Sequence, residues 1–409
     1  MDAVQYSLPH NWMIYNKDEI FRELTDAKAA IMALRTIPYQ RRWVDELQKV
    51  QLKMEVAGTS RIEGADFAAN ELEIALRAQT PEQLMTRSQK QANCAIATYK
   101  WIAGLPDDRP ITVALISEMH ERIVTGCDDD HCAPGKIRPK DQNVTYGAPI
   151  HRGAIGGSDC EDALRELTAV AQSSFYAHDT VIQALALHYH FAAIHPFQDG
   201  NGRTARVLEA LMLQRAGLKD ALFIAMSNFY YDEKRSYLES LNAVGDSNHD
   251  LTAFLKFGLR GIALQANRLA QLIKTEVSKQ IFRNLMHDLF TRLQSTRKRV
   301  IVKRQLMLLE RLLSIDGKIE LGDLASVALG DYHTRKDPYN AMIRDLNRLH
   351  GLGAINVERE LRSDGSRRMM YHIGVNLDWP RTITETQFFE YLDHLPKAKT
   401  HSFLSSIND

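Results

Sequence analysis

Two long apolar runs separated by a short polar segment constrain the fold of this chain more than any other feature. The runs cover residues 181–194 and 207–216, and both are rich in Ala, Leu and Ile. Continuous apolar runs of this length indicate buried helices rather than strands, which are usually shorter. Gly217 follows the second run and is expected to end its helix as a C′ glycine. The segment between the runs is therefore a tight connection between two core helices.

This connection has the sequence His-Pro-Phe-Gln-Asp-Gly-Asn-Gly-Arg-Thr-Ala-Arg. Because Pro196 cannot continue the first helix and disfavours the αR conformation of His195, an imidazole is expected at the exposed rim of the core. The glycines allow backbone N–H groups to gather at the start of the second helix, where the helix dipole favours an anion. These amides belong to Gly200, Asn201 and Gly202.

Charged side chains in the same segment favour a phosphate site. Arg203 and Arg206 are three residues apart and share one helix face, and guanidinium groups suit bidentate contact with phosphate. Asp199 is a carboxylate among cationic groups, as expected of a ligand for a hard metal such as Mg²⁺. His195 is then placed as a general base on a hydroxyl nucleophile. Taken singly, these residues are also typical of an ordinary turn and a helix cap, but their coincidence in one short window favours catalysis.

The window matches His-Pro-Phe-x-Asp-Gly-Asn-Gly-Arg-x-x-Arg at every fixed position and so resembles the Fic domain family. The resemblance implies a mainly α fold, a Fic-type helical core with a small β-hairpin flap. It also implies transfer of AMP from ATP to a Ser, Thr or Tyr hydroxyl of a target protein and of the chain itself. Relatives that phosphorylate carry Lys in place of the second motif glycine, so Gly202 favours nucleotidyl transfer. The implied ATP contacts are Gly200, Asn201, Gly202, Arg203, Arg206, Tyr146, Gly147 and Tyr237.

A second motif precedes this core. Helices are expected over residues 18–36 and 38–57, and the second leads into Thr-Ser-Arg-Ile-Glu-Gly. Thr59 and Glu63 are four residues apart and share a helix face. The motif resembles the inhibitory Ser/Thr-x-x-x-Glu-Gly sequence of many Fic relatives, which implies that Glu63 pairs with Arg206 and denies the outer phosphate of ATP its partner. A surface glutamate at a helix end is the alternative, because so short a motif also occurs by chance.

The long loop from 126 to 157 alternates apolar and polar residues at 136–138 and 143–146, which predicts two short strands. By the resemblance this is the flap, at about 135–150, a hairpin that docks the target backbone by strand addition. An ordinary surface hairpin is the alternative. Tyr237 lies in a tyrosine-rich stretch that is most typical of a core, whereas the resemblance places its ring against adenine.

A composition shift at the basic residues 297–299 begins a further region. Three expected helices (300–313, 321–327, 339–350) and two strands (351–357, 368–375) are typical of a winged helix. Its tip arginines could contact DNA phosphate, but nearby carboxylates dilute their charge, so protein docking or a homodimer contact is an equal alternative. These arginines are Arg359, Arg362, Arg367 and Arg368. The expected domains are an N-terminal helical region at 1–110, the Fic core at 111–260, connecting helices at 261–298, the winged-helix-like domain at 299–376 and a tail at 377–409.

Composition places few further limits on function. The 409 residues contain 51 basic and 51 acidic side chains, so no net charge attracts the chain to nucleic acid or to an anionic membrane. No 18-residue apolar run or signal pattern is present, and four cysteines are too few for a disulfide scaffold. A cytoplasmic location is therefore expected.

The sequence thus predicts a protein adenylyltransferase, a nucleotidyltransferase that uses ATP and Mg²⁺ and is autoinhibited by Glu63. Two alternatives remain open. One is a hydrolase that removes AMP from proteins, with Glu63 aligning a water molecule. The other is a DNA-binding regulator whose core senses nucleotide without turnover.

Overall fold

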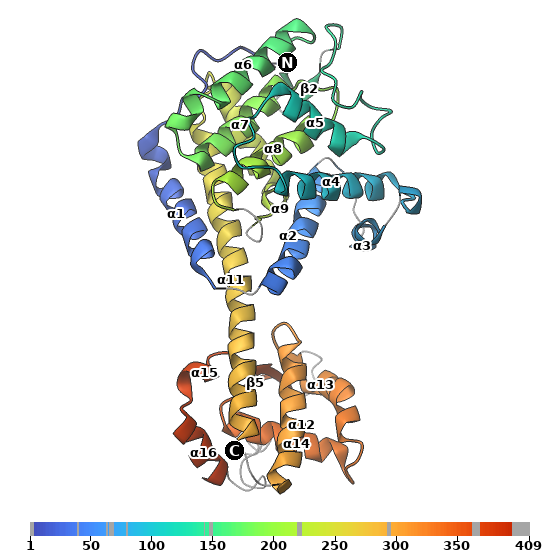
Figure 1. Ribbon diagram of the computed structural model, residues 1–409, viewed down its shortest axis with the longest axis vertical. Helices are drawn as coiled ribbons and strands as arrows, with labels where there is room; N and C mark the ends of the chain where they lie inside the picture. The colour runs from blue at the N-terminus through green and yellow to red at the C-terminus, as the bar shows by residue number, and fades with distance from the viewer. Residues whose placement is uncertain are drawn as a thin grey trace. The chain divides into compact units, whose positions relative to one another are not determined.

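The chain is described by a computed structural model that divides into two compact units, residues 1–273 and 274–409 (Figure 1). The described residues are 4–38, 41–62, 64, 69–78, 81–142, 144–146, 150–218, 223–292, 296–361 and 369–394. Both units consist mainly of helices, which confirms the predicted fold class. Five residues with predicted roles lie outside the described residues: Glu63, Gly147, Arg362, Arg367 and Arg368.

The two apolar runs form a pair of helices at the centre of the first unit, α7 (Thr180–Ile194) and α8 (Asn201–Arg215). Nearly all of their side chains are buried, as the continuous apolar pattern predicts. Besides α7, α8 packs against α4 and α5. Gly217 has φ of +104° and follows the last turn of α8, which confirms the expected glycine terminator.

Two further helices of the first unit begin at residues whose side chains cap the first backbone amides. Asn16 accepts hydrogen bonds from two backbone amides at the start of α1, and Thr86 forms a capping box with Gln89 at the start of α4. Besides α7 and α8, the helices of this unit are α1 (Lys17–Thr36), α2 (Arg41–Ile62), α3 (Ala69–Arg77), α4 (Arg87–Ala103), α5 (Val113–Val124), α6 (Ser158–Ala171), α9 (Met226–Asp232), α10 (Lys234–Asp246) and the start of α11 (Thr252–Thr291). Short 3₁₀ turns are η1 (Pro81–Gln83) and η2 (Ser174–Ala177).

A small sheet with strand order β1-β3-β2 lies in the same unit. Strand β1 (Val4–Gln5) pairs in parallel with β3 (His151–Arg152), and β2 (Thr145–Tyr146) pairs with β3 antiparallel. The hairpin therefore joins β2 to β3, and the predicted strand at 136–138 is wrong. The reason is Arg138, whose buried guanidinium donates to the carbonyls of several loop residues and ties this segment to the core instead.

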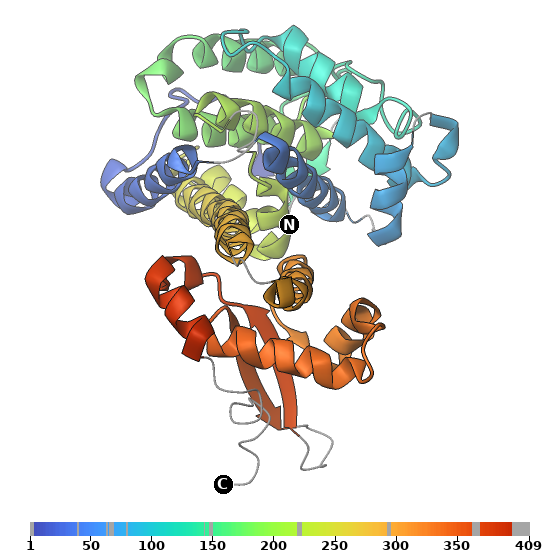
Figure 2. The ribbon, with the colours of Figure 1, turned by 60° about the horizontal axis from the view of Figure 1, so that its bottom comes forward.

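The second unit has the element order helix, strand, helix, helix, strand, strand. Its elements are α12 (Thr296–Leu313), β4 (Ile319–Glu320), α13 (Leu321–Ala328), η4 (Leu329–Tyr332), α14 (Pro338–Gly351), β5 (Ile355–Leu361) and β6 (Met369–Val375). The antiparallel sheet has the order β4-β6-β5, and Figure 2 shows its strands beside the orange helices of this unit. The sequence predicted the three helices and the strand pair β5 and β6, but it did not predict β4. The winged-helix assignment stays a prediction.

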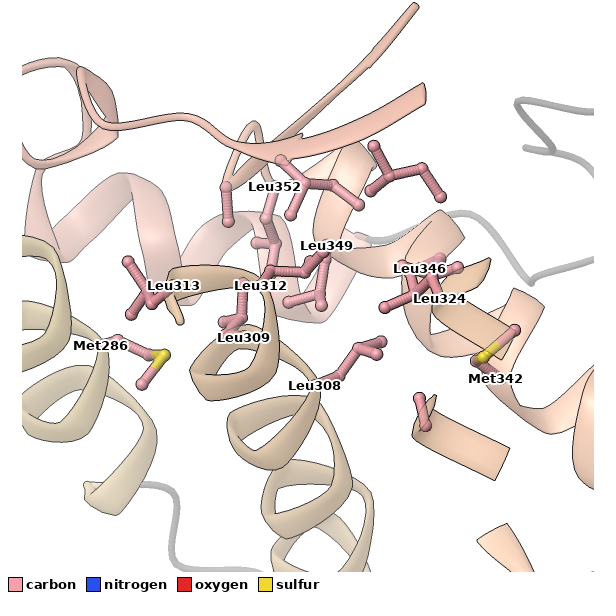
Figure 3. Close-up of a cluster of buried hydrophobic side chains, with 14 of the residues drawn as sticks. Met286, Leu308, Leu309, Leu312, Leu313, Leu324, Met342, Leu346, Leu349 and Leu352 are labelled. Atoms are coloured by element: carbon pink, nitrogen blue, oxygen red, sulfur yellow. The ribbon is translucent and has the colours of Figure 1, made fainter. Parts of the chain in front are cut away.

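Leucine side chains from three helices meet in the core of this second unit (Figure 3). Leu309 and Leu312 of α12 lie among Leu324 of α13 and Leu346 and Leu349 of α14, all of them buried. Burial of each such side chain contributes about 1.5–3 kcal/mol. The spacing of these residues along each helix is why the sequence pattern identified the helices correctly.

The expected domain boundaries stay predictions, and two of them differ from the helix bounds of the structure. Helix α11 runs without a break from Thr252 to Thr291, so the boundary expected at 260 falls inside a helix. Part of the expected tail folds as α15 (Trp379–Thr382) and α16 (Glu385–His394). Trp379 is 1% exposed and its indole N–H donates to the carbonyl of Leu352 at 2.9 Å, so this segment completes the core.

Within the described part of the chain, no helix has the combination of length and apolarity that a membrane span requires.

Candidate active site

The imidazole of His195 is held at the end of α7 in a fixed tautomer. The residue has φ of 53° and ψ of 57°, left-handed values that end the helix and lie outside the αR region that the following proline disfavours. Its Nδ1 lies 3.1 Å from the carbonyl oxygen of Ala192. Because a carbonyl only accepts hydrogen bonds, Nδ1 carries the proton in the neutral ring and Nε2 is the basic nitrogen.

The end of the hairpin lies directly against this histidine. The N–H of Ala154 donates to the carbonyl of Ile194 at 3.0 Å. A Cβ added at Gly153 would lie 2.7 Å from that same carbonyl oxygen and 2.8 Å from the Cβ of His195. Only glycine allows this approach, so strand β3 and His195 are placed relative to one another by backbone packing.

The loop after His195 is closed by a side chain of α8. Asn201 accepts a hydrogen bond from the N–H of Phe197 at 2.9 Å and donates to its carbonyl at 2.8 Å. The ring of Phe197 is buried and stacks on His120 of α5, with centroids 3.7 Å apart. Asn201 is therefore engaged in structure through its side chain, which leaves its backbone amide as the group that meets an anion.

His120 of α5 holds the loop that follows His195 through hydrogen bonds. The sequence did not identify this residue as part of the site. Its Nδ1 accepts from the N–H of Gly135 at 2.9 Å, so Nε2 carries the proton and donates to the carbonyl of Asp199 at 2.9 Å. Burial lowers the pKa of His120 to about 4, so the ring is neutral near pH 7. Nothing in its local sequence distinguishes His120 from an ordinary core residue of a helix.

The N-terminus of α8 has the geometry of an anion site. Gly200 is its N-cap residue with φ of 76°, and it has no side chain to accept from the first amides of the helix. A Cβ at Gly200 would lie 2.7 Å from Cγ1 of Val124 and 3.2 Å from Nε2 of His120. Glycine is thus required at this position both by conformation and by space, as the sequence predicts.

Arg203 is oriented by a buried carboxylate that the sequence analysis did not select. Its side chain is 6% exposed, and its guanidinium forms an ion pair with Asp128 and lies 3.8 Å from the carboxylate of Asp199. Asp128 also accepts hydrogen bonds from Arg87 and Gln91. Burial alone would raise the pKa of Asp128, but the two guanidinium groups outweigh burial and lower it to about 2.

Arg206, the second arginine of the signature, is joined to helix α2. Its Nε donates to Oγ1 of Thr59 at 2.8 Å, and both residues are buried. The structure thus brings together the two motifs that the sequence analysis selected, which lie 147 residues apart. The predicted pairing of Arg206 with Glu63 stays a prediction, because Glu63 is outside the described residues.

Two other predicted ATP contacts have different outcomes. Tyr146 lies in strand β2 of the hairpin, and its side chain is outside what the structure describes. The Tyr237 ring is 4% exposed, stacks on Tyr230 with centroids 4.6 Å apart, and bonds through its hydroxyl to Nε2 of His188 at 2.9 Å. In this structure Tyr237 is a core residue with little ring surface left for adenine, as its tyrosine-rich surroundings also indicated.

Comparisons with known proteins agree with this geometry. Residues 110–213 match the Fic/DOC family. Protein adenylyltransferase Fic of Nematostella vectensis is 39% identical over 159 residues, 37% of this chain and 32% of that protein. Protein adenylyltransferase fic-1 of Caenorhabditis briggsae is 27% identical over 165 residues, 40% of this chain and 30% of that protein. The chain therefore matches about a third of the length of these relatives.

Solved structures share the fold. A Fic family protein from Desulfovibrio desulfuricans G20 superposes with a TM-score of 0.54 at 18% identity, over 90% of this chain and 98% of that one. Fic-1 (aa134–508) from C. elegans superposes with a TM-score of 0.52 at 20% identity, over 63% and 73%. Residues 110–213, which carry His195, the N-terminus of α8 and both signature arginines, are a Fic domain of the Fic/DOC family.

Proposed function

We propose that this chain is a protein adenylyltransferase that transfers AMP from ATP to a hydroxyl group of a protein. The observation that carries the proposal is His195, whose ring is held in the tautomer with a basic Nε2 at the end of α7, in the short loop that leads to the N-terminus of α8, where no side chain caps the first amides. The names of the matched relatives, protein adenylyltransferase Fic and fic-1, support the same activity. A general base next to an anion site is the arrangement that phosphoryl-group chemistry requires.

In the proposed reaction, Nε2 of His195 accepts the proton of the target hydroxyl. The hydroxyl oxygen forms a bond to the α-phosphorus of ATP, the bond between that phosphorus and its bridging oxygen breaks, and pyrophosphate leaves. The amides of Gly200, Asn201 and Gly202 and the guanidinium of Arg203 stabilise the charge that develops on the phosphoryl oxygens. Arg206 binds the outer phosphate.

Asp199 fits the magnesium site that this reaction implies. Its side chain is 41% exposed, and one oxygen accepts from the N–H of Gly200 at 2.6 Å, which fixes the carboxylate at the mouth of the anion site. Mg²⁺ is commonly bound by one or two carboxylates together with substrate phosphates and water, so a single protein ligand is enough. When bound there, the ion would neutralise phosphate charge.

We further propose that an extended segment of the target protein docks on β2. In the sheet order β1-β3-β2, one edge of β3 is already paired with β1 of the chain's own N-terminal arm. Among the described strands, β2 lies at the edge of the sheet, and an edge strand offers a template for one more strand. The close packing of Gly153 on His195 connects this edge to the base.

Autoinhibition by the α2 motif is part of the proposal. Thr59 on α2 already binds Arg206, and Glu63 directly follows Ile62, the last residue of α2. A carboxylate that pairs with Arg206 would remove the partner of the outer phosphate and repel it. The α-phosphate would then be poorly aligned for in-line attack.

Incubation with ATP labelled in the α or γ position tests the proposed function. We expect the Glu63→Gly variant to incorporate α-label into protein and no γ-label, and the His195→Ala change to abolish incorporation. His333→Ala, an exposed histidine of the second unit, is the matched control and should label like its parent. Incorporation of γ-label would indicate phosphorylation instead, and release of AMP from preloaded protein without net transfer would indicate the hydrolase.

A further inference from the structure

We propose that Glu55 is a second positioning residue of the inhibitory device, a buried carboxyl that fixes helix α2 against α4 and α9 and thereby holds Thr59 on Arg206. The inference rests on the proposed autoinhibition and adds to it a residue one turn before the inhibitory motif. Neither the signature segment nor the inhibitory motif contains Glu55.

Glu55 is 2% exposed, and both of its carboxyl oxygens accept hydrogen bonds from groups on other helices. One carboxyl oxygen accepts from the phenol of Tyr99 on α4 at 2.7 Å and from the hydroxyl of Ser227 on α9. The other accepts from the backbone N–H of Ser227 at 2.8 Å, in the first turn of α9. A carboxyl that joins three helices in the core fixes the position of its own helix along and across the others.

Close backbone packing also leaves little room for α2 to shift against α9. A Cβ added at Gly58 would lie 2.5 Å from the amide nitrogen of Asn228, so α2 and α9 touch without an intervening side chain. Glu55 and Thr59 are four residues apart and lie on one face of α2. The anchored carboxyl therefore determines where Oγ1 of Thr59 meets the guanidinium of Arg206.

The charge state of Glu55 also matters to this contact. Glu55, Arg206 and Glu209 are buried and line one small pocket, so their charges act on one another through a poorly polarisable interior. The other titratable groups that face the carboxyl are the phenols of Tyr99 on α4 and Tyr230 on α9. A proton on Glu55 removes repulsion between two carboxylates and supplies an O–H donor for Tyr99 or Ser227.

The direction of the pH dependence follows from this burial. Burial raises the pKa of Glu55 to about 7, against the lowering effect of hydrogen bonds from Ser227 and Tyr99 and with a further rise from Glu209. Detachment of α2 returns the carboxyl to water and to a pKa near 4.3. The docked helix therefore binds more protons, so docking is complete below about pH 4.3, weakens as pH rises to about 7, and is constant above that.

Self-labelling with α-labelled ATP and Mg²⁺ between pH 5.5 and 8 tests this role in the full chain. For each variant, the self-labelling rate is divided by the rate of Glu63→Gly at the same pH. This ratio cancels the titration of the catalytic groups. We expect the wild-type ratio to rise roughly tenfold across this range. Glu55→Gln mimics the protonated carboxyl and should keep a low, flat ratio. Glu55→Ala should have a ratio at least about fivefold above wild type at pH 6.

Three outcomes would overturn the inference. One is a Glu55→Ala ratio equal to wild type, and the second is a Glu55→Gln ratio that rises with pH as wild type does. Circular dichroism would reveal whether Glu55→Ala folds. If it does not, Tyr99→Phe removes one hydrogen bond to Glu55 and should raise the ratio severalfold. The third outcome is a Tyr99→Phe ratio that does not rise. Glu239→Gln, at an exposed pair with Arg235, is the control and should match wild type. Failure of the proposed function looks different, because Glu63→Gly itself would then incorporate no label.

Discussion

Arg206 of the signature helix donates through Nε to Oγ1 of Thr59, at 2.8 Å, in a site where both side chains are buried. This bond connects helix α8, whose N-terminus is the proposed anion site, to helix α2, which carries the proposed inhibitory motif. The guanidinium that we propose binds phosphate is thus held by another part of the chain. The bond therefore links the proposed catalytic site to its proposed control.

Replacement of Thr59 by Ala should weaken that control. The buried guanidinium loses an acceptor, which costs about 1–3 kcal/mol and shifts α2 toward its detached state. We expect self-labelling severalfold above wild type and a lower melting temperature. Thr25→Ala, on an exposed part of α1, should change neither quantity. Labelling that stays at the wild-type level would separate Thr59 from inhibition.

Replacement of Asp128 by Asn should damage both stability and ATP use. The change breaks a buried ion pair with Arg203, a loss of about 3–5 kcal/mol at neutral pH, and leaves the guanidinium without its orienting partner. Chemical denaturation should report the stability loss, and the KM for ATP should rise. Asp130→Asn, at a carboxylate 78% exposed, should stay within about 0.5 kcal/mol.

The stability difference between wild type and Asp128→Asn should also depend on pH. The pKa of Asp128 is lowered in the folded chain to about 2, so the folded state binds fewer protons than the unfolded state between about pH 4 and 2. The contribution of Asp128 is therefore fully present above about pH 4 and is lost as pH falls toward 2. Denaturant midpoints of both chains at pH 3 and pH 7 check this, and an equal difference at both values would contradict it.

Replacement of Gly200 by Ala should destabilise the first unit. The φ of 76° costs an alanine about 1–2 kcal/mol, and its Cβ would clash with Val124. We expect a lower melting temperature and loss of label transfer. Gly104→Ala is the matched control, because a Cβ there meets only ordinary van der Waals contact at 3.5 Å. Equal melting temperatures for both variants would show that Gly200 is not constrained as described.

Replacement of Trp379 by Ala should destabilise the second unit alone, by about 3–5 kcal/mol, since a buried indole and its hydrogen bond to Leu352 are lost. Self-labelling of the Glu63→Gly background should not change, because the site lies in the first unit. Tyr339→Ala, at an aromatic side chain 43% exposed, should leave the melting curve as it is.

The sequence predicted those features of the structure that are determined by residues close together in the chain. The continuous apolar runs of α7 and α8, the helix-ending Gly217 and the turn at Gly200 all follow from a few neighbouring residues. The partner of Arg138 could not be predicted in this way, and its unexpected burial is why the strand expected at 136–138 does not form.

The supporting residues of the site were missed for the same reason. Asp128 meets Arg203 across 75 residues, His120 meets Asp199 across 79, and Glu55 meets Ser227 across 172. Each is an ordinary polar residue in its local sequence, and it acquires its role only when folding brings a distant partner to it. No periodicity or spacing rule selects such residues.

We propose that His195 is the base that activates a protein hydroxyl toward ATP. Single-turnover transfer of α-label in the Glu63→Gly background, with and without His195→Ala, measures this role. We expect rapid incorporation with His195 and a loss of at least about a hundredfold without it, while bound ATP is retained. Equal incorporation by both variants would show that His195 is not the base.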